Sequence, residues 1–251
     1  MESLLVTALI IGMVLVTAAV QRVVGFGFGM VLAPFMVLLL SPHEGVMLVN
    51  FLSVIAPVLI MWQLRSHIEW GTFLWLCGPA VLIMPAAAWL SVRTEPGPLY
   101  IVVAGVVLLG LVISAVTSRI SSTVDGRVPK AVTGAAAGAG TVLAGVGAPA
   151  TAVYTVLSRW QLLPMIATLQ PLWMAMSAVS FGMKWALDDG QLPSLPWWGW
   201  AGSAVAIFLG IVIGQWVQRR VSEAAAGRAV VVLAFVGAVL ALITGVQMTL
   251  A

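Results

Sequence analysis

The chain has 251 residues, of which 62% are hydrophobic and only 8% are charged, with a formal net charge of +3 at pH 7. This composition excludes a soluble globular domain, in which about 25% of residues are charged. It predicts an all-α polytopic membrane protein in contact with a lipid bilayer, because uncharged stretches of roughly 20 residues recur along the sequence. The single cysteine and the lack of an HExxH motif or paired carboxylates predict no metal site and no catalytic site, and we expect no cofactor. The basic residues are scattered among short loops, so they indicate membrane topology and not a nucleic-acid partner.

The first part of the chain predicts a long apolar segment, a glycine-rich break, a short half-helix and three full spans. The break is the sequence GFGFG at residues 25–29, inside an apolar stretch that would otherwise form one membrane helix. Irregular backbone is tolerated at membrane depth only where protein or a water-filled cavity surrounds it. The predicted segments are 3–22, 30–40, 45–63, 70–92 and 98–117.

The most polar stretch, Ser118 to Lys130, divides the chain near its middle. We therefore expect a first membrane repeat over 1–118, a cytoplasmic linker over 119–130 and a second membrane repeat over 131–251. The second repeat has the same order of segments, with the break GVGAP at 145–149, which begins 120 positions after the first break. Its predicted segments are 130–144, 148–158, 162–185, 197–217 and 229–248.

Basic residues gather in two loops, the central linker and the loop before the last helix, and this indicates which side of the membrane each loop occupies. Short cytoplasmic loops carry an excess of Lys and Arg. With both loops inside, each break becomes the tip of a hairpin, the amino terminus lies outside, and each half crosses the membrane three times besides its hairpin. An odd number of crossings predicts that the two repeats are inverted. The basic residues are Arg119, Arg127, Lys130, Arg219, Arg220 and Arg228.

The two breaks predict a substrate site for an anion. Half-helices that begin at Met30 and Ala148 would start inside the membrane, and helix amino termini carry unpaired N–H groups and a partial positive charge. Paired interruptions in two related halves are typical of a transporter's binding site. The alternative is close helix packing through small residues. The glycines that would let backbone approach a ligand are Gly25, Gly27, Gly29, Gly145 and Gly147.

Two amides lie in the span after each break, Asn50 and Gln170, again 120 positions apart. An amide buried in a bilayer needs hydrogen-bond partners, and a substrate oxygen could be one. Hydrogen bonding between helices is the alternative. Trp173, one turn after Gln170, is a candidate cavity wall or a packing residue.

Arg22 is the one basic residue beside a glycine break, and the matching position in the second half is Val142. An arginine within a membrane segment is a candidate partner for an anionic substrate. Snorkelling of its side chain to the nearer interface is the alternative.

The sequence resembles the sulfite exporter TauE/SafE family of transporters. The resemblance rests on GFGFGMVLAP with SPHEGVMLVNF after it, and on GVGAPATAVY with RWQLLPMIATLQP after it. It implies an inner-membrane permease for small sulfur-containing anions such as sulfite and sulfonates. Members often have a triple-glycine run in the first motif, where this chain has Phe26 and Phe28, and Tyr154 stands where the first copy has Pro34. The phenylalanines would suit a partly apolar organosulfonate.

We therefore expect a carrier that exports a small anion. An anion channel with the same half-helices along a pore is the alternative, and unitary currents would distinguish it. An intramembrane enzyme is disfavoured because His43 and His67 fall in predicted loops on opposite sides. A membrane scaffold would not need two matched breaks. No oligomeric state follows from the sequence.

Overall fold

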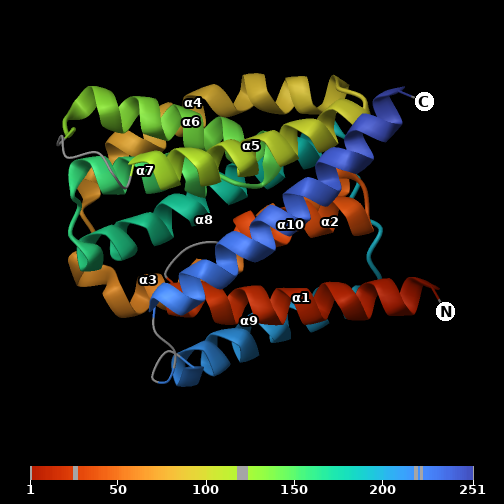
Figure 1. Cartoon of the computed structure of the whole chain (residues 1–251), viewed down its shortest axis with the longest axis horizontal. Helices are drawn as coiled ribbons and strands as arrows, with labels where there is room; N and C mark the ends of the chain where they lie inside the picture. The colour runs from red at the N-terminus through yellow and green to blue at the C-terminus, as the bar shows by residue number, and fades with distance from the viewer. Residues whose placement is uncertain (1, 25–27, 118–123, 218–219, 221–222, 251) are drawn as a thin grey trace.

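The computed structural model describes residues 2–24, 28–117, 124–217, 220 and 223–250, and within them the chain is all helical (Figure 1). A single 3-10 turn, Arg65–His67, follows the third helix. The α-helices are α1 (Glu2–Val24), α2 (Phe28–Leu39), α3 (Pro42–Leu64), α4 (Trp70–Arg93), α5 (Pro96–Thr117), α6 (Arg127–Ala144), α7 (Ala148–Ser158), α8 (Leu162–Leu187), α9 (Trp197–Val217) and α10 (Glu223–Leu250).

Seven helices in the described part of the chain are long and apolar enough to cross a membrane: α1, α3, α4, α5, α8, α9 and α10. A helix satisfies its own backbone N–H and C=O groups, which hydrocarbon cannot do. The short helix α2 is apolar as well. These findings confirm the prediction of an all-α polytopic membrane protein.

The two interruptions fall where the sequence predicts them. Helix α1 ends at Val24 and α2 begins at Phe28, and α6 ends at Ala144 and α7 begins at Ala148. Residues 25–27, which include the predicted site residues Gly25 and Gly27, lie outside the described residues.

Gly145 ends α6 in the left-handed backbone conformation, with φ at 68°. Its N–H donates to the carbonyl oxygen of Thr141 at 3.0 Å, and the N–H of Val146 donates to that of Gly140 at 3.1 Å. This pair of bonds satisfies carbonyls that the helix end leaves open. Glycine adopts this φ without a steric penalty, so the helix can end at Gly145.

Close contacts between backbones hold the outer helix pairs together. Helix α1 packs along α9 and α6 packs along α4, on opposite sides of the bundle (Figure 1). In both pairs, two glycines spaced four residues apart lie against backbone of the partner helix, as small residues do at helix interfaces in membranes. The four approaches are Gly134 to Leu76, Gly138 to Ala80, Gly210 to Leu15 and Gly214 to Ala19.

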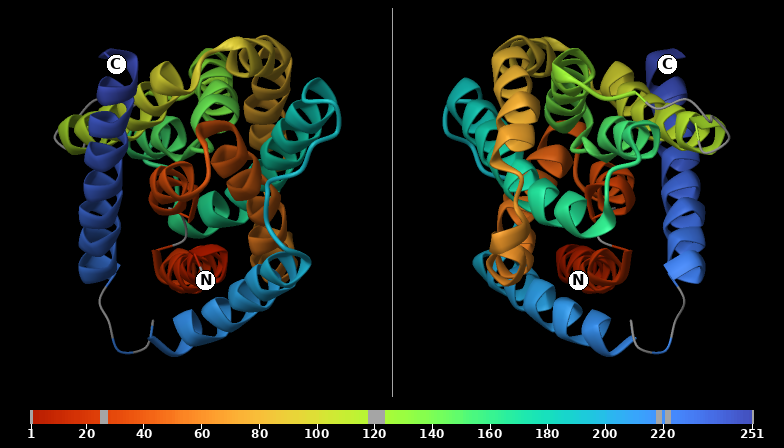
Figure 2. Two further views of the ribbon diagram at one scale, coloured as in Figure 1. Left: turned by 90° about the vertical axis from the view of Figure 1, so that its right-hand side faces the viewer. Right: turned by 90° about the vertical axis from the view of Figure 1, so that its left-hand side faces the viewer.

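The loops gather at the two ends of the bundle. One end, which we call the terminal end, holds both chain termini (Figures 1 and 2). There Oγ of Ser194 donates to Oε2 of Glu44 at 2.9 Å. At the other, the linker end, the N–H of Val124 donates to the carbonyl of Leu157 at 2.8 Å. The loops assigned to one side of the membrane from the sequence therefore meet at one end.

The glycine contacts predict which alanine substitutions disturb the fold. A Cβ at Gly138 would lie 2.6 Å from the carbonyl oxygen of Ala80, so the α4 backbone would have to move. We expect Gly138→Ala to destabilise the protein by about 1–3 kcal/mol, the usual cost of overpacking. Thermal unfolding in detergent measures this.

Gly78 of α4 is the matched control, because a Cβ there has no atom within 4 Å. Alanine also suits a helix better than glycine, so Gly78→Ala should leave the melting temperature unchanged or raise it. Equal melting temperatures for the two variants would show that the α4–α6 contact is loose.

Candidate functional site

A small cavity lies where the two interruptions meet. The space open to the centres of water-sized molecules is about 40 Å³. Since one water needs about 10–15 Å³ on this measure, the cavity has room for a few waters or one small ion. Its lining consists of Gln21, Phe28, Gly29, Met30, Ser53, Pro57, Thr141, Gly145, Val146, Gly147, Ala148, Trp173 and Ser177.

Both half-helices begin at this cavity. Helix α2 contributes its first residues, including Gly29 and Met30, and α7 contributes Ala148 and its N-cap Gly147. From there α2 lies toward the terminal end and α7 toward the linker end (Figure 1). The first N–H groups of a helix have no partner within it. Two sets of backbone donors thus start at one cavity from opposite directions.

In the described residues the backbone beside one break lies against the backbone of the other. A Cβ on Gly29 would collide with the carbonyl oxygen of Gly145, and a Cβ on Gly147 would lie 2.5 Å from Oγ1 of Thr141. A side chain at either position would push these atoms apart. Both positions therefore need glycine for the close approach of backbone to its neighbours.

The polar side chains of the lining are uncharged and include an unused donor. The indole Nε1 of Trp173 is buried without a hydrogen-bond partner in the structure. An indole N–H can only donate. Gln21, with 5% of its surface exposed, contributes an amide, and Thr141 bonds the carbonyl of Ala137 in its own helix at 2.8 Å.

Corresponding positions of the two halves form the lining. Adding 120 to the number of a lining residue of the first half gives, in four cases, a lining residue of the second half. The matched pairs are Gln21 with Thr141, Phe28 with Ala148, Ser53 with Trp173, and Pro57 with Ser177. Gln21, Ser53, Thr141 and Ser177 line the cavity but were not predicted from the sequence. Ser53 lies 120 positions before the candidate Trp173, so the spacing that relates the breaks points to it.

Of the residues proposed from sequence, six line the cavity: Gly29, Met30, Gly145, Gly147, Ala148 and Trp173. Asn50 and Gln170 are fully buried but are not part of the lining. Nδ2 of Asn50 donates to Oγ of Ser180 at 2.7 Å and to the carbonyl of Thr141 at 3.3 Å. Nε2 of Gln170 donates to the carbonyl of Ile166 in its own helix at 3.1 Å. Asn50 thus makes hydrogen bonds between helices, which is the alternative to a bond with the substrate.

Arg22 does not line the cavity either. The Cβ of Arg22 would lie 2.7 Å from a Cβ built on Gly214, so the side chain starts at the α1–α9 contact. Its neighbour Gln21 is the α1 residue at the cavity.

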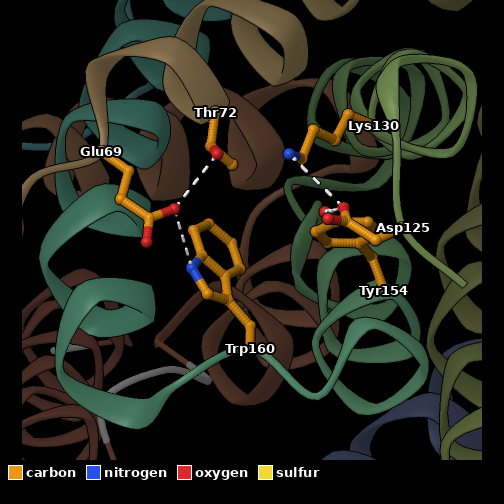
Figure 3. A network of polar contacts seen from close by, with 6 residues as sticks. All are labelled: Glu69, Thr72, Asp125, Lys130, Tyr154 and Trp160. Atoms are coloured by element: carbon orange, nitrogen blue, oxygen red, sulfur yellow. Dashed lines mark hydrogen bonds and ion pairs between the residues drawn. The ribbon is translucent and has the colours of Figure 1, made fainter. Parts of the chain in front are cut away.

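At the linker end, polar contacts fasten the far end of α7 (Figure 3). The hydroxyl of Tyr154 donates to Oδ1 of Asp125 at 2.6 Å, and Nζ of Lys130 lies 3.4 Å from the same oxygen. The hydrogen bond from Tyr154, with that from the backbone of Gly126 and the nearby Lys130, lowers the pKa of Asp125. Hydrogen bonds to a carboxylate favour its charged form.

A second carboxylate lies beside this group (Figure 3). Oε2 of Glu69 accepts from Nε1 of Trp160 and from Oγ1 of Thr72, both at 3.1 Å. The rings of Trp160 and Tyr154 meet edge to face with centroids 5.8 Å apart. Hydrogen bonds and a ring contact therefore join three segments at one place: the start of α4, the linker and the segment after α7.

A bundle of membrane-crossing helices with two interruptions is typical of membrane transporters. The family model described as sulfite exporter TauE/SafE matches residues 9–241, and the chain belongs to this family. The protein is accordingly a multi-pass membrane transporter of a family of small-anion exporters, and not an enzyme. Neither a curated protein nor a solved structure matches the chain.

Tyr154→Phe should make the stability of the protein less dependent on pH. The lowered pKa means that the hydrogen bond stabilises the fold above the ordinary aspartate value of 3.8, and that this gain is lost as pH falls through the lowered pKa. We expect the wild type to melt above Tyr154→Phe at pH 7 and the difference to shrink below 3.8. Because 56% of the Asp125 side chain is exposed, the effect should stay below about 1 kcal/mol.

Tyr100→Phe provides the control, since the hydroxyl of Tyr100 donates at 2.8 Å to the carbonyl of Val37, which does not titrate. Its effect on the melting temperature should not change with pH in the acid range. A constant difference for Tyr154→Phe as well would contradict the role assigned to Asp125.

Proposed function

We propose that this transporter exports sulfite or an organosulfonate across an inner membrane, and that the central cavity is its substrate site. The observation that carries the proposal is the meeting of two half-helix amino termini at one cavity. Each brings unpaired N–H groups and about half a positive charge. An anion is the ligand that such a pair attracts from both sides.

The chemistry of the lining supports an anion over a cation. No carboxylate is present among the described residues of the cavity, so a cation there would have only neutral oxygen ligands and no counter-charge from a lining side chain. The free indole N–H of Trp173 adds a side-chain donor. Donors that are already in place and shielded from water interact strongly with an anion, because the surrounding dielectric constant is low.

Cavity size and aromatic walls support a small sulfur oxyanion. The volume of about 40 Å³ suits a compact ion, and sulfite is a sulfur atom with its oxygens. Phe28 and Trp173 line the same space, so the organic part of a small sulfonate would have apolar surface to contact. This agrees with the suggestion made by the phenylalanines of the first break.

We further propose that the two repeats, 1–118 and 131–251, are inverted, with the linker end in the cytoplasm and the amino terminus outside. The opposite directions of α2 and α7 support inversion (Figure 1). The contacts of α1 with α9 and of α6 with α4 also support a matched pair of halves, because in each the first helix of one half packs on the fourth helix of the other. Arg65, Arg127 and Arg159 at the linker end fit the excess of basic residues in cytoplasmic loops.

Export is the favourable direction for an anion in this orientation. A cell interior at −100 mV releases about 2.3 kcal/mol for each negative charge that leaves. A carrier therefore needs no coupling ion in order to export, although it would need one to accumulate the same anion.

Binding is tested with purified protein and sulfite. A ligand that binds only the folded state stabilises it by about 2.7 kcal/mol at about 100 times its dissociation constant. We expect sulfite to raise the melting temperature of the wild type and chloride to raise it less. Gly147→Val should lose the shift, because a Cβ there would meet Thr141 and Trp173.

Gly182→Val is the control for this variant, since a Cβ at Gly182 has no neighbour within 4 Å and α8 stays intact. Trp173→Phe removes the indole donor without adding atoms, and it should weaken sulfite binding about tenfold. An unchanged sulfite shift in both Gly147→Val and Trp173→Phe would rule out the cavity as the site. Unitary currents in liposomes would favour a channel over a carrier.

Sidedness is tested by cysteine labelling in a Cys77→Ala background. Ser66 is exposed at the linker end and Gln191 is exposed at the terminal end. In intact cells a membrane-impermeant thiol reagent should label Gln191→Cys and reach Ser66→Cys only after the membrane is opened. Labelling of Ser66→Cys first would reverse the proposed orientation.

A further inference from the structure

Helix α8 carries a row of polar side chains from the cavity to the terminal end. Trp173 and Ser177 line the cavity, and Ser180 and Lys184 follow at spacings of three and four residues, which places all four on one face of the helix. Lys184 lies roughly 16 Å along the axis from Trp173 at about 1.5 Å per residue. That is about half of the roughly 30 Å hydrocarbon core, the distance from the midplane to an interface.

Helix α3 packs along α8 and continues the row from the opposite side. Ser53 lines the cavity, and Asn50 lies one turn closer to the terminal end. Nδ2 of Asn50 donates to Oγ of Ser180 at 2.7 Å, while Oδ1 of Asn50 has no partner in the structure. A polar seam in an otherwise apolar interface therefore starts at the cavity.

Lys184 is the unexpected member of this seam, because only 1% of its surface is exposed. No ion pair joins its ammonium to a carboxylate within the described residues. The nearby Asp188 acts on it electrostatically, but Oδ2 of Asp188 lies 3.3 Å from Nε2 of His43. The side chain of Lys184 is thus enclosed by protein with no ion pair among the described residues, and an anion beside it would supply the missing counter-charge.

We propose that the α3–α8 seam is the half of the substrate path between the cavity and the terminal end, with Lys184 as a second station for the anion. This rests on the proposed function of the cavity and adds a route to it. Trp173, Ser177 and Ser180 carry hydrogen-bond donors along the row, and the amino group of Lys184 offers the last before the surface. Both N–H groups of Asn50 are used in bonds to Ser180 and to the carbonyl of Thr141, so Asn50 can donate to an anion only when one of these bonds opens. The Asn50–Ser180 bond closes the seam until an anion exchanges with it. In the proposed orientation, this is the exit.

The test separates binding at the cavity from movement along the seam. Sulfite binding is measured by thermal shift, and transport by uptake of ³⁵S-sulfite into proteoliposomes of the full chain. For Lys184→Met we expect sulfite to raise the melting temperature as much as it does for the wild type, because the cavity is unchanged. The transport rate should fall about tenfold or more, because the substitution removes the amino group from the path. Lys184→Arg keeps the cation and should keep most of the transport.

Arg93→Met is the matched control, since it removes an exposed cation at the same end, where Arg93 lies over the ring of Trp89 on α4. It should transport like the wild type. Lys184→Gln covers the case in which methionine disturbs the fold, and it should show the same separation of binding from transport.

Wild-type transport by both Lys184→Met and Lys184→Gln would overturn the seam as a path while leaving the cavity in place. Loss of the sulfite shift together with transport in both variants would also overturn it, because Lys184 would then support the cavity or the fold. If sulfite neither raises the melting temperature of the wild type nor is transported by it, the proposed function itself would be refuted.

Discussion

Backbone that is interrupted inside a bilayer must have its open N–H and C=O groups enclosed by protein, and the arrangement of this molecule follows from that requirement. Two breaks must be covered, and each lies against the other, with α3 and α8 across them. The breaks can approach closely because glycine stands at the contact points. The first residues of α2 and α7 then line one small cavity. A requirement of the fold therefore brings together the residues of the site proposed for the anion.

Sequence patterns predicted the number and order of the helices, with most boundaries within three residues, because long uncharged stretches, glycine breaks and charged loops leave few alternatives in a membrane. The last helix begins at Glu223, six residues before its predicted start. Six of the residues proposed for the site line the cavity, whereas Asn50, Gln170 and Arg22 do not, and the difference has a geometric cause. Asn50 and Gln170 lie one turn before the lining residues Ser53 and Trp173, on the same helix faces. Arg22 is next to the lining residue Gln21, and neighbours on a helix point about 100° apart. Depth and facing depend on tertiary packing, which a single sequence does not contain.

The two ends of the bundle are fastened by different chemistry. At the linker end, phenol, indole and lysine donors surround two carboxylates, Asp125 and Glu69, at the exposed surface. At the terminal end the lysine is buried, and His43 and Asp188 lie outside it. Each end therefore carries groups of both signs, but the polar contacts of the linker end lie at the surface, whereas the lysine of the terminal end is enclosed.

The contact between Gly29 and Gly145 has a mechanical consequence. Side chains can change rotamer and absorb a displacement, whereas two touching stretches of backbone cannot. A shift of one break must therefore be passed to the other, and α2 and α7 extend from that point in opposite directions. The contact between the two breaks acts as a pivot, so that the tilt of α2 is coupled to the tilt of α7. Such a linkage disfavours states in which both sides of the membrane are open at once.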